Sequence, residues 1–112
     1  MAGKVISLKT TQEWEEQLQM GKEPQKLVVI DFSATWCGPC RLMSPVLDEL
    51  AGQHPQVTFL KVDVDDLRSV AQQWGVEAMP TFVVMKEGKV VERFSGADKD
   101  KLIQLVTKHL NQ

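Results

Sequence analysis

The segment that most constrains the fold is Leu27–Ser33, which has the sequence LVVIDFS. Its β-branched and aromatic residues favour a strand, and its apolar residues do not alternate with polar ones. A strand without this alternation is buried on both faces, which is typical of a parallel sheet that helices cover on each side. We therefore expect an α/β protein built around this strand.

Strand-like and helical segments alternate along the chain. The predicted strands, which are short and rich in β-branched residues, are Val5–Leu8, Leu27–Ser33, Val57–Val64, Thr81–Met85 and Lys89–Phe94. The predicted helices run from a cap at Thr10 to about Gly21, from Pro39 to about Gln53, from Leu67 to Trp74, and from just after Gly96 toward Leu110. This β-α-β-α-β-α-β-β-α order predicts two right-handed β-α-β crossovers and a hairpin, and hence a mixed five-stranded sheet flanked by four helices.

Local signals support these boundaries. Thr10 and Glu13 have the S/T-x-x-E spacing of a capping box at a helix start. Trp14 and Leu18 lie one helical turn apart and are expected to face the core. Gly88 follows Lys86 and Glu87 between the last two strands, as expected for a tight hairpin.

Length and charge narrow the range of functions. With 112 residues the chain has the size of one domain, which we expect to span residues 1–112. The 13 basic and 15 acidic residues give a net charge of −2 without a basic cluster, which argues against nucleic acid as a partner. The longest wholly apolar runs have four residues, whereas a membrane helix needs about 20. No secretory signal opens the sequence, so we expect a cytoplasmic protein.

The two cysteines lie together in Trp36–Cys40, which has the sequence WCGPC, between the buried strand and the next helix. A bridge from Cys37 to Cys40 would restrain little of the unfolded chain, so stability is a poor reason for it. The positive end of the helix favours a thiolate, and Cys37 is expected to be the nucleophile. Cys40, one turn inside and more buried, would resolve the mixed disulfide that Cys37 forms with a partner. Gly38 and Pro39 would keep the loop tight and let a partner's backbone approach.

Other interpretations of the cysteine pair are weaker. A zinc site needs about four ligands, and neither a second Cys-x-x-Cys nor a histidine at ligand spacing is present, so no metal is expected. Inert thiols are also unexpected in an exposed loop that opens a helix. Two functions beside a disulfide reductase stay open: a binding module, which would not need Cys40, and an oxidant or isomerase. Asp63, Asp65 and Asp66 are expected to be solvated and to cap a helix start.

Asp31 interrupts the strand that we expect to be buried on both faces. A buried carboxylate is unfavourable unless it is neutral or paired, so burial should raise its pKa. We hypothesise that it exchanges a proton with Cys40, although a hydrogen-bonded structural role is an alternative. Lys61 would either pair with Asp31 across neighbouring strands or point outward as an edge lysine. Pro80 marks a fixed bend before a strand, and its bond to Met79 could be cis.

These features together resemble the thioredoxin family from end to end. The resemblance rests on the pentapeptide WCGPC at residues 36–40 and on VIDF at 29–32, KVD at 61–63, MPTF at 79–82 and SGA at 95–97. The central Gly-Pro dipeptide is similar to that of thioredoxins rather than to those of glutaredoxin or protein disulfide isomerase. Trp14 and the segment Val70–Trp74 resemble the plant h-type.

The resemblance implies a thioredoxin fold and a protein-disulfide reductase. It implies that Pro80 is cis and lies against the cysteine pair, and that Asp31 and Lys61 are the family's buried acid and its partner. It further implies a flat apolar groove for target proteins, lined by Trp36, Met79, Pro80, Gly96 and Ala97. The electron donor would be an NADPH-dependent thioredoxin reductase. We therefore expect a monomer with no bound cofactor, which uses NADPH only through the reductase.

Overall fold

The computed structural model describes residues 3–112 and contains a five-stranded sheet with four helices. The element order predicted from the sequence is confirmed. The strands are β1 (Val5–Leu8), β2 (Leu27–Ser33), β3 (Thr58–Asp63), β4 (Thr81–Lys86) and β5 (Lys89–Ser95). The helices are α1 (Thr11–Met20), α2 (Gly38–Gln53), α3 (Arg68–Gln73) and α4 (Lys99–Leu110).

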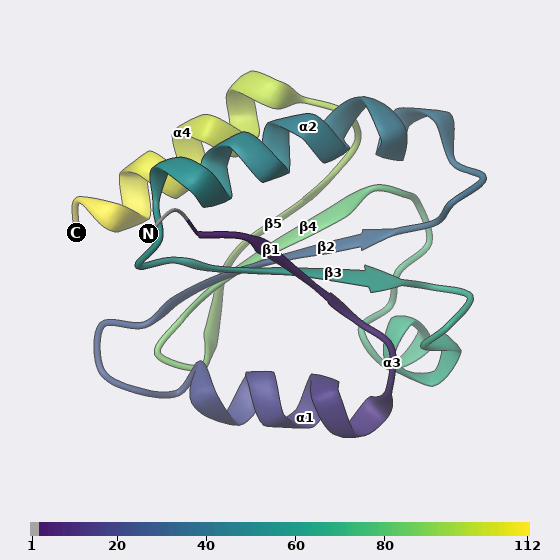
Figure 1. Cartoon of the computed structure of the whole chain (residues 1–112), viewed down its shortest axis with the longest axis horizontal. Helices are drawn as coiled ribbons and strands as arrows, with labels where there is room; N and C mark the ends of the chain where they lie inside the picture. Colours follow the sequence, from purple (N-terminus) through teal and green to yellow (C-terminus); the bar gives the residue numbers. More distant parts are fainter. Residues whose placement is uncertain (1–2) are drawn as a thin grey trace.

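The strands are arranged in the order β1-β3-β2-β4-β5, so β2 occupies the centre of the sheet. β3 pairs in parallel with both β1 and β2, whereas β4 pairs antiparallel with β2 and β5. The carboxyl ends of the three parallel strands therefore lie at one edge of the sheet, on the right in Figure 1. Ligand and catalytic sites of open α/β sheets form at this edge.

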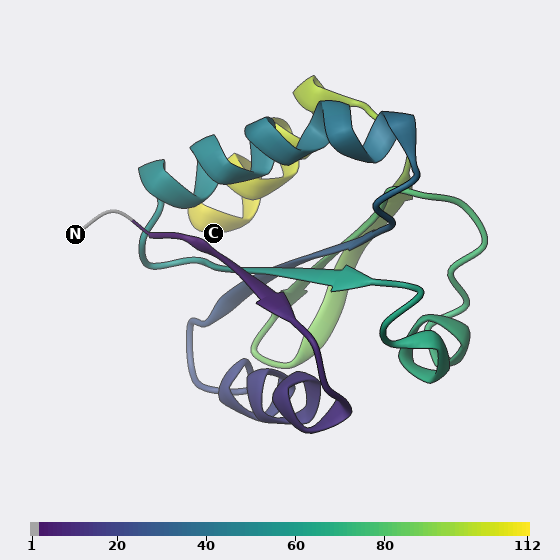
Figure 2. The ribbon, with the colours of Figure 1, turned by 45° about the vertical axis from the view of Figure 1, so that its right-hand side comes forward.

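Helices cover both faces of the sheet, as the uniform burial of β2 requires. Figures 1 and 2 show α2 and α4 together on one face, and α1 and α3 on the other. All seven residues of β2 are buried, which confirms that this strand lies between two layers of helices. Within residues 3–112, no helix is both long and apolar enough to cross a membrane.

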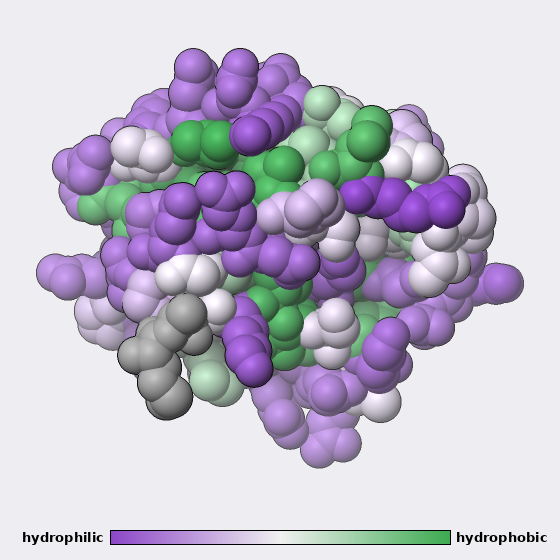
Figure 3. Space-filling model, turned by 45° about the horizontal axis from the view of Figure 1, so that its top comes forward, coloured by the Kyte–Doolittle hydropathy of each residue, from purple (hydrophilic) through white to green (hydrophobic). Residues whose placement is uncertain are grey.

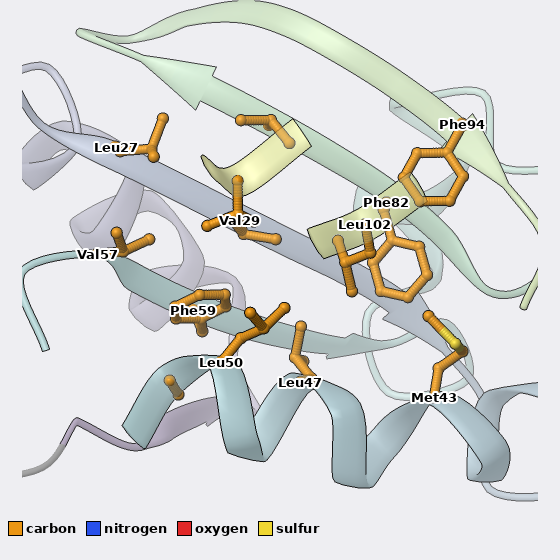
Figure 4. Packing of buried hydrophobic residues seen from close by; sticks show 13 residues of the cluster. Leu27, Val29, Met43, Leu47, Leu50, Val57, Phe59, Phe82, Phe94 and Leu102 are labelled. Atoms are coloured by element: carbon orange, nitrogen blue, oxygen red, sulfur yellow. The ribbon is translucent and has the colours of Figure 1, made fainter. Parts of the chain in front are cut away.

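The core under α2 and α4 is formed by buried side chains from both helices and from the four strands β2 to β5. Figure 4 shows Leu47 and Leu50 of α2 pointing at Val29 and Phe59 of the sheet. Leu102 of α4 joins the same cluster. On the outside, this face is largely hydrophilic, with apolar side chains gathered in narrow strips (Figure 3).

The opposite face carries an aromatic cluster beneath α1. The ring of Trp14 lies 6.0 Å from that of Phe32 and 5.5 Å from that of Trp74, measured between centroids. Trp14 is 3% exposed, and Leu18 packs beside it, which confirms the inner face predicted for this helix. Aromatic rings bury a large area each, so this cluster anchors both α1 and the end of α3 to the sheet.

Helix caps and turns follow the sequence closely. The Thr10 hydroxyl accepts a hydrogen bond from the Glu13 N–H, while the Glu13 carboxylate accepts one from the Thr10 N–H, so the capping box is confirmed. The hairpin turn is shorter than predicted, because Lys86 ends β4. Glu87 and Gly88 alone form the turn, with φ angles of 54° and 84°. Positive φ angles at both positions match the twist of the two strands.

Two leucines of α2 provide a test of this packing. Leu47 is fully buried against the sheet, whereas Leu42 on the same helix is 70% exposed. Leu47→Ala is expected to lower the free energy of unfolding by about 2–5 kcal/mol, because it removes buried methyl groups and leaves a cavity. The matched control Leu42→Ala should change it by less than about 0.5 kcal/mol. Urea denaturation of the oxidised proteins measures both; equal effects would contradict the packing described above.

Candidate active site

The candidate site begins where β2 runs into α2, at the right of Figure 1. Cys37 is the N-cap residue of α2, with φ −88° and ψ 114°, and Pro39 lies in the first turn. The Cys37 Sγ accepts a hydrogen bond from the Cys40 N–H at 3.2 Å. A cap that accepts a backbone N–H at the positive end of a helix stabilises negative charge, so this position favours a Cys37 thiolate in the reduced protein.

Cys37 and Cys40 form a disulfide, with their Cα atoms 5.3 Å apart. Cys40 is more buried than Cys37, as predicted, but their exposed fractions differ little, at 4% and 6%. The two cysteines differ in their backbone position instead. Cys37 caps the helix, whereas Cys40 lies within its first turn and contributes its N–H to the cap.

The segment before β4 lies against the cysteine pair. Its Met79–Pro80 peptide bond is cis, as the family resemblance implies. The Met79 carbonyl oxygen lies 3.6 Å from the Cys37 Sγ, a contact rather than a hydrogen bond because a disulfide sulfur carries no hydrogen. Pro80 is buried, and its carbonyl accepts a hydrogen bond from the Gly96 N–H at 2.9 Å. Successive contacts therefore join three segments that are far apart in the sequence, from Cys37 to Met79 and from Pro80 to Gly96.

Side chains outside the motif hold this segment in place. The Arg93 guanidinium donates hydrogen bonds to the carbonyl oxygens of Trp74 and Gly75, at 2.6 and 3.0 Å. The Thr81 hydroxyl donates to the Ala78 carbonyl and lies 2.8 Å from the Ser95 hydroxyl. These contacts are not predictable from the sequence, because nothing in a linear pattern shows that β5 and the loop after α3 lie side by side.

The Trp36 side chain is hydrogen-bonded to Asp65, which the sequence predicted to be merely solvated. Its indole N–H donates a hydrogen bond of 2.8 Å to the Asp65 carboxylate, although the Trp36 side chain is otherwise exposed. Asp63 does have the capping role expected of this acidic run, since its carboxylate accepts the Asp65 N–H at 2.8 Å. The orientation of Trp36 beside the disulfide is therefore fixed by a charge-assisted hydrogen bond.

The surface around Cys37 is open and mostly apolar. Trp36 is 62% exposed, Met79 is partly exposed, and Ala97 follows Gly96 on the surface. A side chain added at Gly38 would meet no atom of the chain within 4 Å, so the space above this residue is free for an approaching backbone. Gly96 has a φ angle of 110°, which other residues adopt only with strain.

Asp31 is fully buried on the face of β2 that carries α2. Within the described part of the chain, neither of its carboxyl oxygens has a hydrogen-bond partner. Burial raises the pKa of Asp31 from 3.8 to about 7, and the charge of Lys61 opposes this shift only in part. The raised pKa expected from the sequence is confirmed, and it places a titrating carboxyl group under the active-site helix near neutral pH.

Lys61 fits neither of its two predicted roles fully. The edge-lysine interpretation is wrong because β3 lies between β1 and β2. Lys61 does pair in register with Asp31, but the described side chains include no hydrogen bond or ion pair between them. Its ammonium group donates instead to the Ser44 hydroxyl of α2, at 2.8 Å. Across residues 3–112, no group of three or more His, Cys, Asp or Glu side chains could hold a metal ion.

This arrangement supports one chemistry in particular. Two cysteines that already form a disulfide occupy the N-terminus of α2, beside an open surface, and a buried carboxyl group lies on the sheet face that this helix covers. A thiolate at such a position can attack a disulfide of another molecule, and its neighbour can displace the product. The fold and the site thus define a thiol-disulfide oxidoreductase.

Comparisons with known proteins identify the family. A family model described as thioredoxin matches residues 5–108. The chain is 54% identical to a thioredoxin H-type of Ricinus communis over 96% of its length and 92% of that protein. It is 51% identical to thioredoxin H1 of Arabidopsis thaliana, over 96% and 95% of the two chains. The crystal structure of the thioredoxin h of Nicotiana alata is similar with a TM-score of 0.92 and 45% identity, over 97% and 95%. The chain belongs to the thioredoxin family.

The buried carboxyl group makes stability depend on pH. Between about pH 4 and pH 7, folded Asp31 keeps a proton that the unfolded chain has lost, so the free energy of unfolding falls as pH rises and levels off above pH 7. Asp31→Asn removes the titrating group, so the free energy of unfolding no longer falls with pH on its account. The variant is expected to be more stable than the wild type at about pH 8 by a few kcal/mol, since one pKa unit corresponds to about 1.4 kcal/mol, and equally stable near pH 4.

Urea denaturation of the oxidised proteins at both pH values measures the difference. Asp48→Asn, which changes an exposed carboxylate on α2, is the matched control and should leave the pH dependence unchanged. A stability difference that is the same at both pH values would contradict the raised pKa of Asp31.

Proposed function

We propose that the chain reduces disulfides of target proteins, with Cys37 as the nucleophile and Cys40 as the resolving thiol. The observation that carries this assignment is the position of Cys37, which caps α2 and accepts the Cys40 N–H. The Met79 carbonyl and the exposed Trp36 flank Cys37, so a target disulfide can approach it from the open side. Cys40 lies within bonding distance behind it.

The reaction transfers two electrons in two exchange steps. The Cys37 thiolate attacks one sulfur of the target disulfide, which breaks that disulfide and releases the other sulfur as a thiolate. Cys40 then loses its proton and attacks the Cys37 Sγ, which breaks the mixed disulfide and releases the second target thiolate. The target is reduced by two electrons, and Cys37 and Cys40 are oxidised to the disulfide.

Asp31 is our candidate for the base that takes the proton of Cys40. A base works best when its pKa lies near the working pH, and burial brings the pKa of Asp31 to about 7. A purely structural role is less well supported, because in the described part of the chain neither carboxyl oxygen of Asp31 accepts a hydrogen bond.

The exposed surface around Cys37 is our candidate docking groove for the target. Trp36, Met79, Pro80, Gly96 and Ala97 would form its walls, and the Met79 backbone would pair with the target strand. The hydrogen bond from Trp36 to Asp65 and that from Gly96 to Pro80 support a groove of fixed shape. A preformed groove binds an extended chain with a smaller loss of conformational freedom.

We further propose that an NADPH-dependent thioredoxin reductase returns the electrons, so the chain itself needs no bound cofactor. The family match over residues 5–108 supports this donor and supports residues 1–112 as one domain acting as a monomer. The cytoplasm is the proposed compartment, because a dithiol reductant requires surroundings that keep thiols reduced.

Serine substitutions of the two cysteines test the assignment. With insulin as the target and NADPH plus a plant thioredoxin reductase as donor, the wild type should be fast and Cys37→Ser inactive, because it lacks the nucleophile. Cys40→Ser should lose turnover but accumulate a covalent adduct with the target, detected by mass spectrometry, because the mixed disulfide cannot be resolved.

A parallel assay with dithiothreitol as donor separates the two parts of the proposal. If the wild type were active with dithiothreitol as donor but inactive with NADPH and the reductase, the reductase would be contradicted as the donor. The dithiol mechanism would remain intact. Full turnover by Cys40→Ser would contradict the resolving role. A wild type no faster than dithiothreitol by itself would favour a binding module that acts without turnover.

Asp31→Asn tests the proton transfer. An amide cannot accept the proton of Cys40, so resolution should slow by about 100-fold near pH 7, at the lower end of the range typical of general acid–base catalysis. The measurement is the single-turnover rate at which the mixed disulfide disappears, with Asp48→Asn as control. An unchanged rate near neutral pH would leave Asp31 a structural residue.

A further inference from the structure

A cavity of about 300 Å³ opens beside the active-site helix, between the ends of the three parallel strands and the first turns of α2. Most of its lining residues are polar, and they comprise three cations, four hydroxyl residues and one carboxylate. The lining residues are Ser7, Leu8, Lys9, Ser33, Ala34, Thr35, Cys40, Arg41, Ser44, Lys61 and Asp63. The site described above uses Cys40 of this set and has Lys61 beside it, but it gives Ser44 no role.

The sheet register connects this cavity with Asp31. Ser7 of β1 is paired with Lys61 of β3, and Lys61 is paired with Asp31 of β2. Side chains of paired residues in neighbouring strands point to the same face of the sheet. These three residues therefore form one row that leads from the edge strand to the buried carboxyl group.

Lys61 has two possible partners in this arrangement. Its ammonium group donates to the Ser44 hydroxyl at 2.8 Å, while both oxygens of its register neighbour Asp31 lack a partner in the described chain. A lysine and an aspartate side by side on neighbouring strands would ordinarily attract each other strongly in a poorly solvated place. Among residues 3–112, the hydrogen bond to Ser44 is the contact that directs the ammonium group away from that pairing.

The other charges near Asp31 leave Lys61 as its immediate cationic neighbour. Lys9 pairs with Asp66 at 3.5 Å, and Arg41 and Asp63 line the outer part of the cavity. On the other side, β4 places the uncharged Phe82 next to Asp31 in register. The buried residues of α4 are Leu102, Val106 and His109. The first two carry no charge, and the His109 imidazole lies 2.9 Å from the Glu92 carboxylate of β5.

We propose that Ser44 is a positioning residue, whose hydroxyl group holds the Lys61 ammonium in the cavity and prevents it from closing an ion pair with Asp31. This inference deepens the proposed function, because it rests on Asp31 as the group that takes the proton of Cys40. A closed ion pair would favour the carboxylate and lower the pKa of Asp31 by about 1–3 units. An aspartate with such a pKa would be a poor base for a thiol near neutral pH.

Ser44→Ala tests the proposal directly. Without the hydroxyl, Lys61 is free to turn toward Asp31, so the titration midpoint of Asp31 should move to lower pH by about one unit. The readout is ¹³C NMR of the Asp31 carboxyl carbon in the oxidised protein, assigned by its loss in Asp31→Asn. The pH profile of mixed-disulfide resolution should move in the same direction.

Three further variants exclude a merely structural effect. Ser7 lines the same cavity, but the Lys61 ammonium group donates to Ser44 rather than to Ser7. Ser7→Ala should therefore leave the titration midpoint of Asp31 unchanged. Ser44→Thr restores a hydroxyl and should restore the wild-type midpoint. In a Lys61→Gln background, Ser44→Ala should have no effect, since the charge that it releases is absent.

An Asp31 midpoint that does not move in Ser44→Ala would overturn the proposal. So would an equal shift with and without Lys61, which would mean that Ser44 acts through packing. The NMR titration does not depend on turnover, so it separates this proposal from the one that it rests on. If Ser44→Ala moves the midpoint while Asp31→Asn resolves mixed disulfides at the wild-type rate, Ser44 positions Lys61 as proposed and Asp31 is not the base.

Discussion

The structure depends on the burial of β2 on both faces. Because helices cover this strand on each side, any polar side chain within it must lie in a poorly solvated place, and Asp31 does. At the end of the same strand the chain turns into α2, and Cys37 forms the cap of this helix. The burial of β2 thus raises the pKa of the carboxyl group, and the turn at the end of the strand sets the position of the Cys37 sulfur.

Sequence analysis predicted those features that depend on near neighbours. The capping box at Thr10, the two-sided burial of β2 and the order of the elements follow from local patterns of residues. It did not anticipate Asp65 beside Trp36 or the burial of His109, whose imidazole lies 2.9 Å from the Glu92 carboxylate. Such contacts join residues far apart in the chain and leave no periodic signal.

The two opposed interpretations of Lys61 show where this limit lies. Sequence alone placed a lysine on a strand but could not say that β3 is an inner strand, which follows from the pairing of β1 beyond it. The sequence also could not identify the Ser44 hydroxyl as the partner of the Lys61 ammonium group. This contact depends on where along β3 the helix α2 packs. Side-chain partners depend on packing, and packing is known only after the layers are assembled.

The contacts of Arg93 limit how the edge strand β5 can be redesigned. β5 carries exposed residues such as Val90 and Val91, and it offers a free edge that looks suitable for grafting a tag or a new binding strand. However, the guanidinium group of Arg93 donates hydrogen bonds to two backbone carbonyls of the loop that leads to Met79. Its planar fork cannot be replaced by a lysine without losing one of them. The first half of the strand is open to redesign, whereas its second half is part of the scaffold of the redox centre.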